Sequence, residues 1–376
     1  MKDLHPLAGV RRPLGEATGL PNAHYVDPEV HADEARAVLL GTWAGLAVAA
    51  QVPEPGDAVP VTLAGVPLLL LRDRDGQVRV FQNVCRHRGM ILVAAPRRIE
   101  GAIRCPYHSW CYSTKGRLVA TPHVGGPGRN VDERLDRSDL NLAEVRSHVW
   151  RDVVFVNVDG TAPPFAQAQA ALIERWAEFE EDRAGALHHD GRSFTLEVAG
   201  NWKLAVENYC ESYHLPWVHP GLNSYSRLED HYHIEHGDHS GQGTRVYRQL
   251  EVDGARFPDF AGLSDKWDTA AEYVAVYPNV LMGVHRDHAY AILLMPDGHD
   301  RTLEHVHVYY PAPVADATLA DRNAALWKGV FEEDVFVVEG MQAGRHAPGF
   351  DGGRFSPAMD GPTHAFHDWI ARRMGA

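Results

Sequence analysis

The sequence predicts an α+β protein in which an all-β module is followed by a larger domain with helices flanking an antiparallel sheet. Three features of the 376-residue chain predict this. Short Val-, Leu- and Ile-rich runs separated by turn residues fill the stretch 43–160, which is typical of an all-β module. After residue 161, runs of strand length occur between long helical patterns, which favours an α+β domain. The apolar fraction of 45% and the charged fraction of 23% are those of an ordinary globular protein.

We expect an N-terminal helical segment at 1–42, the all-β module at 43–160 and the larger domain at 161–376. In the first segment, Ala and Leu recur at helical spacing from Pro28 to Leu40. Asp27 is the expected N-cap of this helix, and Pro28 suits its first position.

The all-β module contains several runs that we expect to form strands. Asp75-Gly76 lies between two of them and predicts a tight hairpin turn. The expected strands are Val59–Leu63, Val66–Arg72, Val78–Val84 and Val153–Val158.

In the larger domain, Phe165–Ala184 and Thr318–Gln342 have helical patterns. Another helix is expected to start after Asn201 and to end near Leu215, because a proline disfavours helical conformation in the residue before it. A turn at 296–298 separates two of the expected strands. These strands are Ala271–Val284, Tyr290–Met295 and Leu303–Tyr310.

Composition argues against several classes of partner and location. Acidic residues outnumber basic ones 50 to 36, which gives a net charge of -14 and no attraction to nucleic acid or an anionic membrane. The longest apolar stretch, Ala37–Val52, is interrupted by glycines and is too short to span a bilayer. The N-terminus lacks the pattern of a secretory signal, and four cysteines do not form a disulfide framework in a chain of this length. We therefore expect a cytoplasmic protein.

Two Cys–His pairs predict the first metal site. Cys85-x-His87 is followed by Cys105-x2-His108, and each pair lies in a loop between apolar runs. Two cysteines on one iron and two histidines on the other form the Rieske type of [2Fe–2S] cluster. The alternative is a structural zinc site, but a zinc finger usually places its cysteines together and its histidines together.

The expected helix after Asn201 carries candidate ligands for a second metal. His214 lies near its end, and His219 lies just beyond, where it can turn back towards His214. Glu207, Glu211 and His214 share one face, which would ordinarily be a solvated polar face. The opposite face is expected to be buried and carries Trp202, Val206, Tyr209 and Tyr213.

Asp334 is the candidate third ligand. It interrupts an apolar stripe of the helix at 318–342, whereas Glu332 and Glu333 are expected to point elsewhere and to be solvated. A carboxylate that faces a core needs compensation, which a metal or a buried ion pair would provide. With His214 and His219 it would complete a two-histidine, one-carboxylate site that leaves positions open on Fe(II) for dioxygen and substrate.

Taken together, these motifs resemble the α subunits of Rieske non-haem iron oxygenases, over about 43 to 369. The matching residues are Cys85-x-His87, Cys105-x2-His108, Asn201-Trp202-Lys203, Glu207-Asn208-Tyr209, Glu211-x2-His214-x4-His219, Asp334 and Met341-Gln342-x-Gly344. The resemblance implies a Rieske [2Fe–2S] domain, a catalytic domain with mononuclear Fe(II), and a ring-shaped homotrimer. It also implies catalytic roles for Asn208 and for Glu211, which would bridge His108 of one subunit and His214 of the next.

The positions of the extra cysteine pair found in high-potential Rieske proteins correspond to Met90 and Tyr107. The resemblance therefore implies a low-potential cluster of the oxygenase type. Cys111 and Cys210 have no expected metal role and are expected to be buried free thiols.

Glu211 stands where many family members have aspartate, and this glutamate is similar to the subgroup that oxidises choline, betaines and carnitine. Tyr209, Trp217 and Tyr225 could hold such a cation through their ring faces, although core packing is the ordinary role of aromatic residues. The subgroup has a cysteine where this chain has Ser212. An aromatic ring hydroxylase or O-demethylase therefore remains an alternative.

No nucleotide-binding glycine loop occurs in the sequence, so electrons from NAD(P)H would need a separate reductase, acting directly or through a ferredoxin. Dioxygen and a small organic molecule would be the substrates. The remaining alternatives are a non-catalytic Rieske electron carrier, which would hold two irons per chain rather than three, and a redox sensor, which would show no substrate-dependent oxygen uptake.

Overall fold

The computed structural model describes residues 7–375, which form two compact units. One unit comprises residues 40–42 and 46–161. The other combines residues up to Leu39 with Trp43–Gly45 and the chain from Ala162 onward. The N-terminal helices therefore belong to the same unit as the C-terminal half. Among the described residues, no helix is both long enough and apolar enough to cross a membrane.

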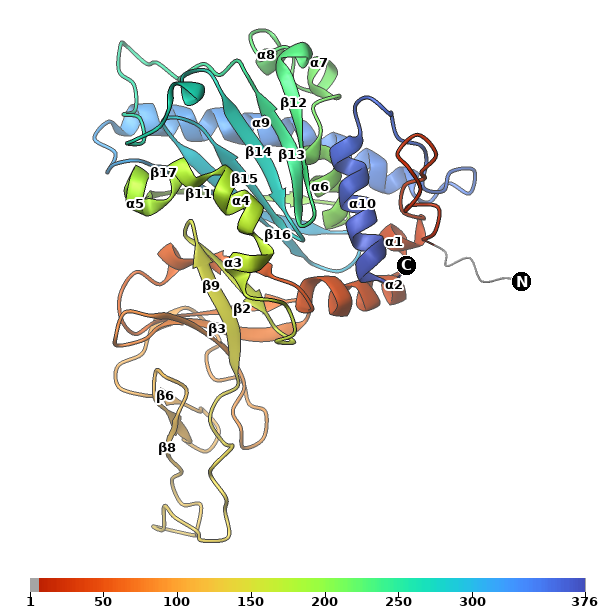
Figure 1. Cartoon of the computed structure of the whole chain (residues 1–376). Helices are drawn as coiled ribbons and strands as arrows, with labels where there is room; N and C mark the ends of the chain where they lie inside the picture. Colours follow the sequence, from red (N-terminus) through yellow and green to blue (C-terminus); the bar gives the residue numbers. More distant parts are fainter. Residues whose placement is uncertain (1–6, 376) are drawn as a thin grey trace. The chain divides into compact units, whose positions relative to one another are not determined.

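The first unit is built on a seven-stranded sheet of order β1-β10-β9-β4-β3-β2-β5. Figure 1 labels β2, β3 and β9 of this sheet. The expected strands are confirmed, and β3 and β4 pair as an antiparallel hairpin around Asp75-Gly76, where Gly76 has a positive φ of 83°. A three-stranded sheet of order β6-β7-β8 completes the unit. The strands are β1 (Ala44–Val48), β2 (Asp57–Leu63), β3 (Val66–Arg72), β4 (Val78–Gln82), β5 (Arg97–Arg98), β6 (Ile103–Arg104), β7 (Cys111–Tyr112), β8 (Leu118–Ala120), β9 (Glu144–Trp150) and β10 (Val153–Asn157).

The second unit is built on an antiparallel sheet of order β11-β17-β16-β15-β14-β13-β12. The strands are β11 (His188–Val198), β12 (His231–His236), β13 (His239–Thr244), β14 (Ala271–Val276), β15 (Val280–Val284), β16 (Ala289–Pro296) and β17 (Thr302–Tyr310). The prediction of one strand over Ala271–Val284 is wrong, because β14 and β15 form a hairpin around Pro278, which has no N–H for a ladder. The hairpin expected at 296–298 is confirmed.

Three helices pack around this sheet, and Figure 1 shows the long α9 crossing it. They are α6 (Trp202–Cys210), α9 (Ala317–Gly344) and α10 (Gly361–Arg373). The sheet and α6 contribute much of the buried core, including Trp202, Val274, Leu294 and Val306. The remaining helices of the chain are short: α1 (Ala23–Val26), α2 (Pro28–Glu34), α3 (Phe165–Ala168), α4 (Ala170–Arg175), α5 (Glu181–Ala184), α7 (Leu215–Val218) and α8 (Pro220–Asn223).

Two helix predictions had different outcomes. The helix from Pro28 to Leu40 is confirmed, with its last six residues in π-helical form and with Asp27 accepting the N–H of Glu29 at 2.8 Å. The continuous helix expected over Phe165–Ala184 is wrong, because this segment forms α3, α4, a 3-10 turn and α5. Its aromatic residues are anchored separately: Trp176 Nε1 donates to Glu272 at 2.8 Å, and Phe179 packs edge-on against Trp267.

Candidate metal centres

The two Cys–His loops of the first unit have the same backbone hydrogen bonds. The Cys85 N–H donates to Met90 O, and the Cys105 N–H donates to Trp110 O, both at 2.8 Å. The residue four positions after each cysteine donates back to that cysteine's carbonyl, at 3.0 and 3.1 Å. That residue has a positive φ in both loops, 72° at Gly89 and 58° at Ser109. The two loops are therefore turns of the same backbone type.

These loops bury the cysteines and expose the histidines. Cys85 and Cys105 are 3% and 2% exposed, whereas His87 and His108 are exposed. The two imidazole centroids lie 4.8 Å apart. This donor set fits a Rieske cluster, in which Cys85 and Cys105 would hold one iron and His87 and His108 the other. The chain offers no second cysteine pair here, because Met90 and Tyr107 occupy the corresponding loop positions and both are exposed.

In the second unit, α6 positions the other candidate site. Asn201 caps its start by accepting the Lys203 N–H at 3.1 Å. The helix ends at Cys210, so the prediction of an end near Leu215 is wrong. Glu211 is extended, with φ −121° and ψ 163°, and its carboxylate accepts the backbone N–H groups of Tyr213 and His214. Because these bonds require Glu211 to lie outside a helix, a short loop precedes α7.

His214, His219 and Asp334 lie close together, each offering one ligand atom within 4.8 Å of the others. His219 Nε2 lies 2.9 Å and His214 Nε2 lies 3.8 Å from Asp334 Oδ1. Asp334 Oδ1 is buried and has no hydrogen-bond partner within residues 7–375. Two imidazole nitrogens directed at a carboxylate oxygen that lacks a hydrogen bond form a donor set that fits Fe(II).

A second carboxylate orients each histidine. His214 Nδ1 donates to Glu211 Oε1 at 2.6 Å, and His219 Nδ1 donates to Glu333 Oε2 at 2.8 Å. These bonds fix the ring tautomers, leaving both Nε2 lone pairs free for a metal. The prediction that Glu333 is merely solvated is therefore wrong, although its side chain is 49% exposed. Glu332 does point elsewhere and pairs with Lys328.

A cavity of about 390 Å³ adjoins these three residues and is lined by them. Asn208 and Tyr209 from α6 and Trp327 and Phe331 from α9 contribute to its walls. Most of the lining is apolar or aromatic, which is typical of a small-molecule site. Its aromatic residues are Tyr209, Tyr225, Tyr247, Tyr273, Tyr290, Trp327 and Phe331.

One wall of the cavity is fixed by a chain of buried hydrogen bonds. Trp327 Nε1 donates to His288 Nε2 at 2.7 Å. An indole nitrogen can only donate, so His288 accepts at Nε2 and donates its Nδ1–H to Asp287 Oδ1 at 2.8 Å. Tyr247 Oη donates to the same oxygen at 2.7 Å. The Trp327 and Tyr247 rings are therefore held in place before any ligand binds.

Comparison with known proteins identifies the two units. Residues 185–376 match the ring hydroxylating alpha subunit (catalytic domain), which is half of the chain. Residues 42–135 match the Rieske [2Fe-2S] domain. The chain belongs to the ring-hydroxylating α subunit family. It is a Rieske oxygenase that uses a [2Fe–2S] cluster and a mononuclear non-haem iron.

Relatives of this oxygenase are named for two activities. It is 27% identical to choline monooxygenase, chloroplastic, of Arabidopsis thaliana, over 94% of this chain and 82% of the relative. It is 26% identical to the carnitine monooxygenase oxygenase subunit of Escherichia coli (strain K12), over 90% of this chain and 87% of the relative.

Solved structures share the fold of the oxygenase. A quaternary ammonium Rieske monooxygenase has a TM-score of 0.80 at 22% identity, with 98% of both chains covered. Naphthalene 1,2-dioxygenase from Rhodococcus sp. has a TM-score of 0.74 at 20% identity, with 94% of both chains covered. The α+β architecture expected from the sequence is thus confirmed.

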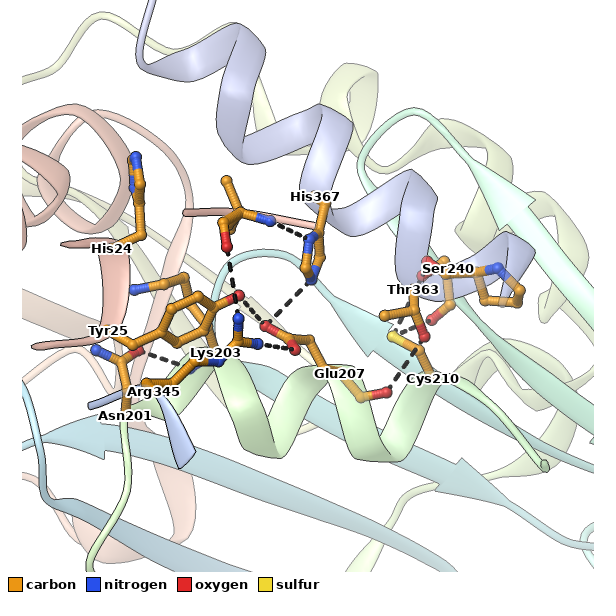
Figure 2. A network of polar contacts seen from close by, with 12 residues as sticks. His24, Tyr25, Asn201, Lys203, Glu207, Cys210, Ser240, Arg345, Thr363 and His367 are labelled. Carbon is orange, nitrogen blue, oxygen red and sulfur yellow. Dashed lines mark hydrogen bonds and ion pairs between the residues drawn. The ribbon is translucent and has the colours of Figure 1, made fainter. Parts of the chain in front are cut away.

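The helix that precedes Glu211 is anchored by a buried polar network, in which Figure 2 shows Glu207 at the centre. Tyr25 Oη donates to Glu207 Oε1 at 2.5 Å, and Arg345 approaches Oε2 at 3.5 Å. The Leu20 N–H donates to His367 Nδ1, so His367 Nε2 carries the proton that faces Glu207 at 3.1 Å. Burial opposes ionisation of Glu207, but His367, Arg345 and Tyr25 together lower its pKa. The expected solvated face is therefore wrong for Glu207.

Charges in this network are paired, because Lys203 Nζ lies 2.6 Å from Glu34 while Arg345 faces Glu207. The network joins the N-terminal segment to α6, α9 and α10. It therefore holds α6, which precedes His214, together with α9, which carries Asp334. Removing one partner would leave an uncompensated buried charge, which is strongly destabilising.

Some expected aromatic roles are also revised. Core packing is the ordinary role expected of Tyr209, Trp217 and Tyr225, but Tyr209 and Tyr225 line the cavity, and Trp217 is 71% exposed and does neither. Tyr213, expected in the core, is 43% exposed. Cys111 and Cys210 are buried free thiols, as expected.

Proposed function

We propose that this oxygenase hydroxylates a carbon close to the quaternary nitrogen of a small quaternary ammonium compound. The observation that carries the proposal is the aromatic cavity that opens onto His214, His219 and Asp334. A quaternary ammonium keeps its charge at every pH and has no N–H to donate. Aromatic ring faces suit it because they attract a cation without needing a hydrogen bond from it. The names of the choline and carnitine monooxygenase relatives support this substrate class.

We assign the cluster to Cys85, His87, Cys105 and His108, and the iron to His214, His219 and Asp334. When bound, the iron supplies dioxygen activation and the cluster supplies electrons. Asn208 is 7% exposed and lines the cavity, where its amide can donate a hydrogen bond to a bound reactant.

We further propose a homotrimer in which the cluster of one subunit serves the iron of its neighbour. The route runs from His108 through Glu211 to His214 of the neighbouring subunit. Exposure of His87 and His108 supports it, as does the bond from His214 to Glu211 Oε1. The exposed pair Tyr213 and Trp217, with ring centroids 5.8 Å apart, follows Glu211 and would contribute to the interface.

A separate NAD(P)H-dependent reductase, acting directly or through a ferredoxin, would supply two electrons per turnover. One oxygen atom then enters the C–H bond, and the other leaves as water with two protons. We propose a cytoplasmic location, since none of the four cysteines forms a disulfide, which suits a reducing compartment.

The test is oxygen uptake by the reconstituted protein with a reductase, screened over quaternary ammonium compounds and aromatic acids. We expect uptake with a quaternary ammonium compound, with one oxygen and one NAD(P)H consumed per product. The Asp334→Ala variant should show none. Uptake and product formation with aromatic compounds alone would contradict the proposed substrate class.

A further inference from the structure

The loop that follows β13 forms one wall of the cavity. Residues 246–251 all line it. Within this stretch, the Tyr247 hydroxyl donates to Asp287 at 2.7 Å. Gln249 and Glu251 bond to Phe257 and Arg256, further along the same irregular segment, at 2.9 and 2.7 Å. The side chains on either side of Arg248 are therefore already engaged in hydrogen bonds.

Arg248 lies between these anchored residues and is exposed. Its guanidinium lies 5.2 Å from the ring centroid of Tyr225, which lines the same cavity. No carboxylate within residues 7–375 lies at ion-pair distance from it. The two acidic side chains of the cavity lining are already engaged, since Glu251 pairs with Arg256 and Asp334 belongs to the iron site.

A guanidinium stacked on a tyrosine keeps its N–H edge free, and that edge matches a carboxylate in a two-bond geometry. Deeper in the cavity the lining is aromatic instead of cationic. Tyr290 and Trp327 are 1% and 5% exposed there, and their ring centroids lie 4.7 Å apart. The exposed end of the cavity is thus cationic, and the buried end offers aromatic faces.

We infer that Arg248 selects quaternary ammonium compounds that also carry a carboxylate, and disfavours those with a neutral alcohol in its place. This inference rests on the proposed function. The substrate cation enters first, towards Tyr290 and Trp327, and the carboxylate remains at the exposed end against Arg248. Arg248 is a specificity-determining residue and takes no part in the chemical step.

The experiment compares a trimethylammonium carboxylate with the trimethylammonium alcohol of equal chain length, using kcat/KM from product formation. Arg248→Gln should lower kcat/KM for the carboxylate about tenfold, mainly through KM, because a charged hydrogen-bonded pair at an exposed site is worth about one factor of ten. The value for the alcohol should change by less than about twofold. Arg248→Lys should keep part of the preference, as it keeps the charge and loses the two-bond geometry.

Arg245→Gln is the matched control. Arg245 precedes the same wall and also lies over a tyrosine ring, 5.0 Å from the centroid of Tyr232, but it does not line this cavity. It should leave the carboxylate preference unchanged. An equal ratio in Arg248→Gln and wild type would overturn the inference and leave the proposed function standing. Product from neither compound, nor from any other quaternary ammonium compound, would overturn both.

Discussion

Glu333 provides a sharp test of the iron site, because its neighbour Glu332 serves as a built-in control. Glu333 Oε2 accepts the Nδ1–H of His219 at 2.8 Å, which holds Nε2 towards Asp334. Replacing Glu333 by Ala frees the ring to rotate and removes a carboxylate that makes the imidazole more basic. Such outer partners are worth about 10- to 100-fold in metal affinity. Since the Glu333 side chain is 49% exposed, we expect the lower end, about tenfold or ~1.4 kcal/mol.

The assay is an anaerobic Fe(II) titration of protein from which the mononuclear iron has been removed while the cluster is retained. The visible spectrum of the cluster reports that the Rieske domain is intact in every variant. Glu332→Ala removes only an exposed pair with Lys328 on the same helix, so its Fe(II) affinity should equal that of wild type. Equal affinity in Glu333→Ala and wild type, or equal losses in the two variants, would refute the orienting role.

Two further predictions concern electron transfer and stability. Glu211→Gln should keep the iron in both sites but lower turnover on the order of a hundredfold, measured as product per time against iron content, and full activity would reject the bridge. Burial lowers the pKa of His307 to about 4, with His189 adding to the effect. In the unfolded chain this histidine has a pKa of about 6.5, so below that pH it binds a proton that the folded chain excludes. The free energy of unfolding therefore falls on acidification, by about 1.4 kcal/mol per pH unit between pH 6 and 4.5. His307→Gln should remove that part of the slope in urea unfolding, and an unchanged slope would show that His307 titrates normally.

Much of the fold could be predicted from local sequence patterns. The runs Val59–Leu63 and Val66–Arg72 form the expected strands because β-branched and apolar residues suit a half-buried sheet. The Asp27 cap is correct for the same local reason. Proline was misleading, since Pro216 lies in the first turn of α7, where its missing N–H costs nothing, rather than after a helix end.

The site was harder to predict wherever a residue depends on distant partners. His214 and His219 are close in sequence, and Asp334 stood out because it interrupts an apolar stripe. Nothing local distinguishes Glu333 from Glu332, however, because only the packing of α9 beside His219 decides which one accepts its N–H. Glu207 is similar, since its partners Tyr25, Arg345 and His367 come from far apart in the chain.

This single chain holds iron at two chemically distinct places, a Rieske cluster and a mononuclear site. Iron and acid-labile sulfide per chain, measured on wild type and Asp334→Ala, test it most directly. We expect about three irons and two sulfides in wild type, falling to about two irons with unchanged sulfide in the variant, since a Rieske cluster contains two of each. Two irons per chain in both proteins, or zinc without sulfide, would show that the chain lacks one of these two iron sites.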